Sequence, residues 1–305
     1  MCAEQITISP IDGSVYVRRA HADKTTIDST LDRARVAQRQ WKSVALSERK
    51  ALCSKAVDAL VAKKDELAGE ICRQMGRPIS AAGAEINGLE ERARAMIGLA
   101  DEGLSPIRLA DKPGFERWIQ REPLGVVFVI APWNYPYLTA VNAIMPAILA
   151  GNSVVLKHSA QTPLCSERFH QAFQAAGLPE GVFQYLHLSH NDTEDIVRDE
   201  RVDYVAFTGS VSGGAMVEHA AAGRFIGVGL ELGGKDPAYV RADAELSHAV
   251  EVTMDGAFFN SGQSCCGIER IYVHESVYDA YLQQAITWVN KLKLGRPDAQ
   301  DTTLG

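Results

Sequence analysis

The sequence predicts an α/β protein built on a doubly wound parallel sheet. Between residues 126 and 232, five short apolar runs alternate with four segments of helical pattern. Runs that are apolar throughout and rich in β-branched residues are typical of strands buried on both faces of a sheet. Because such strands alternate with helices here, we expect them to lie parallel to one another.

The first 110 residues are predicted to be mostly helical. Within residues 46–78, Leu52 and Leu60 belong to an apolar series with a spacing of four, which is typical of one face of a helix. Gly76 and Pro78 follow, and both residue types end helices. No repeat or low-complexity tract interrupts this region.

Residues 111–125 are predicted to be extended segments joined by a turn. The predicted strands that follow are 126–130, 153–157, 182–186, 204–210 and 225–232. The predicted helices between them are 137–149, 163–176, 192–198 and 213–221. The chain therefore divides into an N-terminal helical part (1–110), an extended bridging segment (111–125), the sheet domain (126–231) and the start of a cysteine-bearing α/β domain (232–305).

Composition excludes several classes of protein. Hydrophobic residues make up 46% of the 305 residues and charged residues 23%, as in ordinary globular chains. A net charge of −7 opposes a broad phosphate-binding face, so neither nucleic acid nor an anionic membrane is an expected partner. No apolar run approaches the roughly 20 residues that span a bilayer, and no secretion signal is visible. A reduced, cytoplasmic setting is expected, because no C-x-x-C pair occurs among the six cysteines: Cys2, Cys53, Cys72, Cys165, Cys265 and Cys266.

Candidate site residues follow the predicted strands, because open parallel sheets bind ligands beyond the carboxyl ends of their strands. Trp133 and Asn134 follow the first strand, where the Asn134 amide either satisfies a turn or donates to a developing oxyanion. Lys157 ends the second strand, either as a solvated terminus or in contact with a ribose or phosphate. Gly209 and Ser210 precede a helix, as a structural turn or as a pyrophosphate site.

A carboxylate and two adjacent thiols complete the candidate set. Glu231 ends an apolar strand expected to be buried, where it is either a surface residue or a group kept for proton transfer. A disulfide between Cys265 and Cys266 would strain the peptide between them, and ligands at metal-binding spacing are lacking around the pair. A core role and a nucleophilic role both remain, and a Gly-rich loop near helix amides would assist ionisation of a nucleophile. His187 and His190 are three residues apart without supporting ligands.

Five motifs resemble those of the aldehyde dehydrogenase superfamily and occur in its order, from about Thr26 to the last residue: PWNYP, GNSVVLK, FTGS, LELGGKDP and FFNSGQSCC. The resemblance implies a Rossmann-like coenzyme domain and oxidation of a small-molecule aldehyde to a carboxylic acid. Cys265 would be the nucleophile that forms a thiohemiacetal and then a thioester, and Asn134 would contribute to the oxyanion hole. Glu231 would be the general base for hydrolysis, and Cys266 a wall of the pocket.

The resemblance also implies NAD or NADP as the cofactor. The residues carried over as cofactor contacts are Trp133, Lys157, Gly209, Ser210 and Leu232. No metal is implied.

Three departures from the family pattern qualify these expectations. Ala160 stands where NAD-preferring members often place a glutamate, so Lys157 is free to pair with the 2′-phosphate of NADP. Around Ser189 the chain lacks the Gly-rich turn of many members. Roughly the final third of a family member is expected to be missing from this chain. The missing part would include the C-terminal strand that serves assembly of a homo-oligomer and that pairs, in the family, with the segment near Trp118. Two alternatives stay open: a coenzyme A-acylating semialdehyde dehydrogenase and an inactive, truncated nucleotide-binding fragment.

Overall fold

The computed structural model describes residues 4–305, and its centre is a five-stranded parallel sheet. The sheet has the order β7-β6-β5-β8-β9. Its strands are β5 (Val126–Ala131), β6 (Ser153–His158), β7 (Phe183–Tyr185), β8 (Tyr204–Thr208) and β9 (Gly227–Glu231). The helices between them are α5 (Pro136–Leu149), α6 (Leu164–Ala175), α7 (His190–Arg198) and α8 (Val211–Ala221). The predicted fold class is confirmed.

The sheet is covered on both faces, which explains why β5 and the middle of β6 are apolar. All six residues of β5 and all six of β6 are buried. Successive side chains of a strand point to opposite faces, and accordingly Val127 and Val129 enter one core while Phe128 and Ile130 enter another. The first core includes residues of α5 and α6, and the second includes residues of α7 and α8.

Four helices lie between residues 24 and 104: α1 (Lys24–Trp41), α2 (Leu46–Val61), α3 (Lys64–Met75) and α4 (Ile79–Leu104). Gly76 takes a left-handed conformation at φ 80° and ends α3, as its position predicted. An antiparallel hairpin of β1 (Glu4–Ile8) and β2 (Val15–Ala20) precedes these helices and was not predicted.

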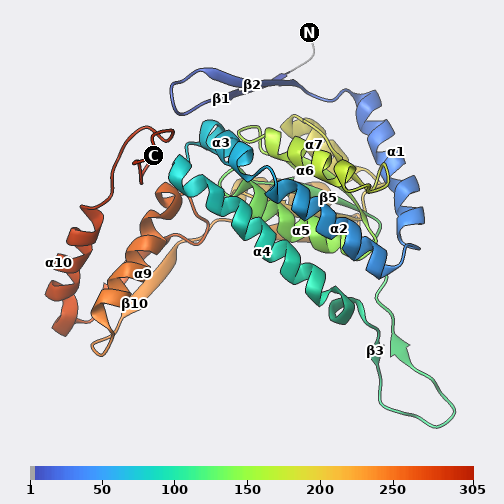
Figure 1. Ribbon diagram of the computed structural model, residues 1–305. Helices are drawn as coiled ribbons and strands as arrows, with labels where there is room; N and C mark the ends of the chain where they lie inside the picture. Colours follow the sequence, from blue (N-terminus) through green and yellow to red (C-terminus); the bar gives the residue numbers. More distant parts are fainter. Residues whose placement is uncertain (1–3) are drawn as a thin grey trace.

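Two parts project from this body (Figure 1). The first is a hairpin of β3 (Ile107–Arg108) and β4 (Trp118–Ile119), where extended segments joined by a turn were expected. It carries exposed apolar side chains, including Trp118. The second is a lobe of β10 (Asp236–Val240), α9 (Leu246–Phe258), the 3₁₀ turns η1 (Phe259–Gly262) and η2 (Glu275–Val277), β11 (Ile268–Val273) and α10 (Tyr278–Val289).

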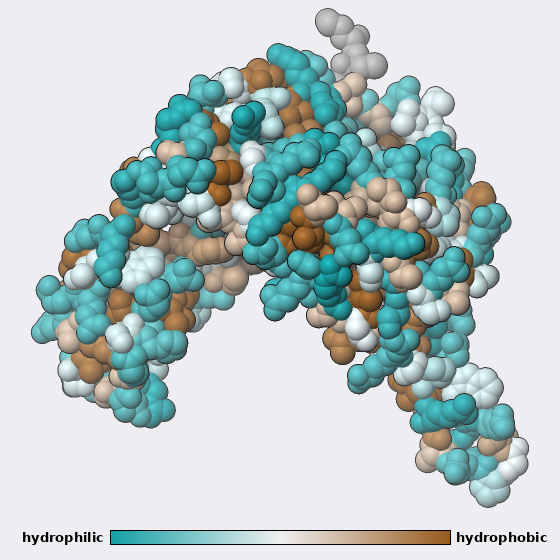
Figure 2. Space-filling view, viewed as in Figure 1, coloured by the Kyte–Doolittle hydropathy of each residue, from teal (hydrophilic) through white to brown (hydrophobic). Residues whose placement is uncertain are grey.

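The lobe has a small core of its own. Its strands β10 and β11 pair in parallel, and the buried residues around them are Val240, Val250, Met254, Tyr281 and Ala285. The space-filling view shows the surface hollowed between the lobe and the body (Figure 2).

None of the helices among residues 4–305 is both long and apolar enough to cross a membrane. Nor do these residues gather three or more His, Cys, Asp or Glu side chains in a metal-binding arrangement. The five cysteines in this range are all free thiols, and Cys2 lies outside the described residues.

Candidate functional site

A cavity of about 920 Å³ lies at the carboxyl ends of β8 and β9, where these strands meet the lobe. Its walls include Glu231, Cys265 and Cys266, together with the aromatic residues Tyr135 and Phe259. These residues come from β9, from η1 and the loop after it, and from the residue that caps the start of α5. The carboxylate and the thiols, which are over thirty positions apart in the sequence, therefore share one cavity.

Glu231 is the last residue of β9, and it is exposed. The expectation that it ends a buried strand is wrong, because β9 lies at the edge of the sheet and its residues are only partly covered. The backbone of Glu231 is nevertheless held, since its carbonyl accepts a hydrogen bond from the Gly209 amide at 3.0 Å.

Cys265 and Cys266 are exposed in the loop that follows η1. Partial burial of the thiol raises the pKa of Cys265, and the neighbouring Cys266 raises this pKa further. The backbone amides of the two cysteines lower it, but not enough to offset the rise. The amides of the loop therefore act in the expected direction, but burial and Cys266 have the larger effect in this arrangement. Gly234 lies against the same loop: a β-carbon there would be 2.3 Å from the Cys265 carbonyl oxygen.

Asn134 is half-buried in the loop between β5 and α5. Its side-chain amide donates to the Gln263 carbonyl at 3.1 Å, and its side-chain oxygen accepts from the Tyr135 amide at 3.0 Å. The amide is thus directed at the segment that carries Cys265. Trp133, the preceding residue, is 40% exposed.

Lys157 lies near the end of β6, and its residue is only 8% exposed. Within residues 4–305 the Lys157 ammonium forms neither a hydrogen bond nor an ion pair, and burial lowers its pKa. A buried cation without a partner favours an anionic ligand, since an unpaired charge is costly to bury. Ala160, two residues beyond β6, accepts a hydrogen bond at its carbonyl from the Thr7 hydroxyl at 2.8 Å.

Gly209 and Ser210 form the turn between β8 and α8. Ser210 caps the helix, because its hydroxyl accepts from the Gly213 amide at 3.1 Å. The eleven-residue helix α8 directs its N-terminus outward at this exposed turn, where a phosphate group is favoured. Leu232 packs against the same helix: a β-carbon at Gly214 would be 2.6 Å from its side chain. Lys157 and this turn thus provide two groups suited to phosphate, on strands that flank β5 on either side.

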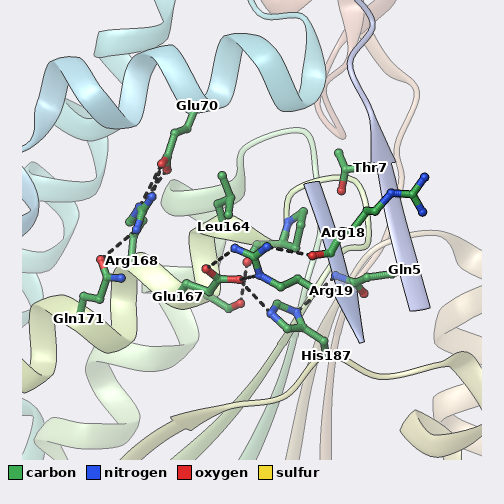
Figure 3. Close-up of polar contacts among 12 residues, drawn as sticks. Gln5, Thr7, Arg18, Arg19, Glu70, Leu164, Glu167, Arg168, Gln171 and His187 are labelled. Carbon is green, nitrogen blue, oxygen red and sulfur yellow. Dashed lines mark hydrogen bonds and ion pairs between the residues drawn. The ribbon is translucent and has the colours of Figure 1, made fainter. Parts of the chain in front are cut away.

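Two polar residues outside the cavity have structural partners. Ser189 caps α7 in a reciprocal capping box with Asp192. His187 lies 3.1 Å from the Glu167 carboxylate, which also binds Arg19 (Figure 3).

Three buried polar residues beside the site were missed in the sequence: Arg77, Glu85 and Asn260. Arg77 lies between Gly76 and Pro78, which were interpreted only as residues that end a helix. Glu85 was detectable, because it lies on the apolar face of α4 between Ala82 and Leu89, both fully buried. A carboxylate on such a face requires a partner.

Known proteins resemble this chain over almost its whole length. The family model described as "Aldehyde dehydrogenase family" matches residues 3–305. The chain is 32% identical to a probable succinate-semialdehyde dehydrogenase [NADP(+)] of Synechocystis, over 98% of this chain and 66% of the relative. It is 31% identical to the succinate semialdehyde dehydrogenase [NAD(P)+] Sad of Escherichia coli, over 98% of this chain and 65% of the relative. The chain thus spans slightly less than two thirds of the length of these curated relatives.

A solved structure has the same fold. Succinic semialdehyde dehydrogenase from Streptococcus pyogenes, in complex with NADP+, superposes with a TM-score of 0.93 at 27% identity, over 99% of this chain and 66% of that one. Since the family match extends over almost the whole sequence, this chain belongs to the aldehyde dehydrogenase family.

Proposed function

We propose that this chain carries the coenzyme-binding and thiol-bearing parts of an NAD(P)-dependent dehydrogenase that oxidises an aldehyde to a carboxylic acid. The observation that supports this proposal above all is the shared cavity of Glu231 and Cys265, beside the Asn134 amide. A nucleophile, a base and an oxyanion donor are the groups that oxidation through a thioester requires.

In this proposal Cys265 loses its proton to solvent, and its sulfur forms a bond to the aldehyde carbon. The Asn134 amide donates to the resulting oxyanion. When bound, the nicotinamide ring supplies the acceptor for the aldehyde hydrogen and its electron pair, which leaves a thioester at Cys265. Glu231 takes a proton from a water molecule, the water oxygen attacks the thioester, and the carbon–sulfur bond breaks to release the acid.

NADP is proposed as an accepted cofactor alongside NAD. Lys157 offers an unpaired, buried ammonium, and Ala160 provides no carboxylate to repel a 2′-phosphate. The printed names of the Synechocystis and Streptococcus pyogenes proteins specify NADP+, and that of the Escherichia coli protein specifies NAD(P)+.

Semialdehydes are the substrate class to test first, because these three relatives are named for succinate semialdehyde. We also propose that the whole protein is a homo-oligomer. The exposed Phe115, Trp118 and Ile119 of the β3–β4 hairpin support this, since large apolar side chains on a projecting hairpin favour association.

The test measures formation of NADH or NADPH by the purified chain with succinate semialdehyde and with aromatic and amino aldehydes. Cys265→Ala is expected to abolish turnover. Glu231→Gln is expected to retain a burst of about one equivalent but to slow steady-state turnover about 100-fold or more, since it removes the base for thioester hydrolysis. Cys266→Ala, the matched control, is expected to stay within about threefold of the parent chain.

Two results would overturn this assignment. Full steady-state turnover by Glu231→Gln would exclude Glu231 as the base, and formation of acyl-coenzyme A as the main product on adding coenzyme A would indicate the acylating alternative. Nucleotide binding by the parent chain without turnover of any aldehyde would show that this chain is not itself the catalyst.

A further inference from the structure

Arg77 lies between α3 and α4, and its side chain is 2% exposed. Its guanidinium donates in three directions: to the Glu85 carboxylate at 2.5 Å, to the Asn134 carbonyl at 2.6 Å and to the Asn260 side-chain oxygen at 2.8 Å. One buried side chain of the N-terminal helices thus contacts both the loop that carries the Asn134 amide and the turn that precedes Cys265.

Glu85 connects Arg77 to the first turn of α5. Its second carboxylate oxygen accepts from the Tyr137 amide at 3.0 Å and from the Leu138 amide at 2.9 Å, both in the first turn of α5. A buried ion pair stabilises an arrangement only where its remaining hydrogen-bonding positions are also filled. Here they are filled by the first turn of α5, which begins two residues after Asn134.

Asn260 joins the two loops through its own side chain. Its amide nitrogen donates to the Asn134 carbonyl at 3.1 Å and to the Gln263 carbonyl at 3.2 Å, while its oxygen accepts from Arg77. Its backbone is left-handed at φ 52°, and Ser261 follows at φ 58°. Such conformations are unfavourable for residues other than glycine, and they persist where surrounding contacts fix them.

We propose that Arg77, Glu85 and Asn260 form a clamp that sets the separation between the Asn134 amide and the loop of Cys265. Arg77 and Asn260 are positioning residues, since they contact the two loops through hydrogen bonds and are absent from the walls of the cavity. The effect of the clamp on catalysis rests on the proposed function, whereas its effect on the positions of the two loops does not.

Two variants and one control test the clamp. Asn260→Gly keeps the left-handed turn, which glycine adopts readily, and removes the amide that joins the loops. Arg77→Lys keeps the charge but replaces the planar fork with a single ammonium. Arg168→Lys is the matched control, because Arg168 forms a half-buried ion pair with Glu70 away from the cavity (Figure 3).

Hydrogen–deuterium exchange of peptides covering residues 131–138 and 258–268 is the first readout, and circular dichroism checks that each variant is folded. Both peptides are expected to exchange at least about tenfold faster in both clamp variants, because the shared hydrogen bonds are lost from both loops together. Arg168→Lys is expected to leave both peptides unchanged. Unchanged exchange in Asn260→Gly, or faster exchange of only one peptide, would overturn the clamp.

The rate of Cys265 alkylation by iodoacetamide as a function of pH is the second readout, resolved from Cys266 by tandem mass spectrometry. Both clamp variants are expected to change the pH–rate profile of Cys265, and the control is not. A profile identical to that of the parent chain would contradict the proposal. Neither readout uses an aldehyde or a cofactor, so a failure of the clamp is distinguishable from a failure of the proposed function.

Where the parent chain turns over an aldehyde, kcat and KM provide a third readout. Misplacing a catalytic group by about 1 Å lowers rates by about 100-fold, so kcat is expected to fall by that factor in Asn260→Gly. KM is expected to change less than about threefold, because the cavity walls are intact. A change confined to KM would count against positioning.

Discussion

At Gly234, the lack of a side chain determines how closely two backbone segments approach. The segment that leaves β9 passes the Cys265 carbonyl so closely that a β-carbon would be 2.3 Å away, a distance at which real β-carbons are essentially never found. Gly233, its neighbour, has open space at the same position. The two glycines therefore have different roles although they are adjacent.

Gly234→Ala is expected to displace the Cys265 loop and to lower aldehyde turnover about 100-fold, because the methyl group and the carbonyl cannot share one position. The free energy of unfolding is expected to fall by about 1–3 kcal/mol, as in other overpacked sites. Turnover assays and thermal melts measure the two effects. Gly233→Ala serves as the control, and an equal loss in both variants would show that steric contact with Cys265 is not the cause.

Among the elements, the β1–β2 hairpin is joined to the body by an ionic cluster (Figure 3). Arg19 of β2 binds both oxygens of Glu167 at 2.6 and 3.0 Å, and His187 contacts the same carboxylate at 3.1 Å. Burial alone would raise the pKa of Glu167, but the hydrogen bonds from His187 and Arg19 outweigh it and lower the pKa to about 2. Tyr185 lies beside His187, with 5.4 Å between ring centroids.

This lowered pKa predicts a dependence of stability on pH. The contribution of ionised Glu167 is complete above its ordinary pKa of 4.5 and is lost as the pH falls toward about 2. Glu167→Gln is expected to lower the free energy of unfolding by about 1–3 kcal/mol at pH 7, and to flatten its decline below pH 5. Denaturant titrations at several pH values measure this.

Glu4→Gln is the control, because the Glu4–Arg18 pair of the same hairpin is about half exposed. Such pairs contribute little to stability. An acid-induced decline equally steep in Glu167→Gln and in the parent chain would show that other groups cause it.

The whole molecule contains cores of unequal size. The two cores of the sheet include central strands that are buried along their full length, whereas the core of the lobe has the five buried residues Val240, Val250, Met254, Tyr281 and Ala285. Apolar burial is the main favourable contribution to folding. The lobe that carries Cys265 is therefore expected to open at lower free energy than the sheet.

Native-state hydrogen exchange tests this expectation across the chain. Amides of α9, β11 and α10 are expected to exchange at least about tenfold faster than those of β5 and β6, because local opening exposes less apolar surface in the lobe. Mass spectrometry of peptic fragments provides the comparison. Uniform protection of both regions would mean that the chain opens only as one unit.

The sheet was predictable because its strands are mostly apolar runs, and each observed strand lies within or close to its predicted range. The β1–β2 hairpin was not, since its short strands mix polar and apolar residues and are held partly by Arg19 and Glu167, which are 148 positions apart. For the same reason Arg77 was missed: its partner Asn260 is 183 positions away. Motifs that follow strands indicated the candidate site, whereas the contacts that hold it depend on the assembled fold.

The left-handed turn at Asn260 also limits how the gene can vary at this codon. A single nucleotide change there yields aspartate, histidine, isoleucine, lysine, serine, threonine or tyrosine. Aspartate keeps an acceptor but sets a carboxylate against two carbonyls, and the others lack the planar amide, the tolerance of positive φ, or both. Drift away from asparagine therefore requires two mutations at once or passage through an impaired intermediate.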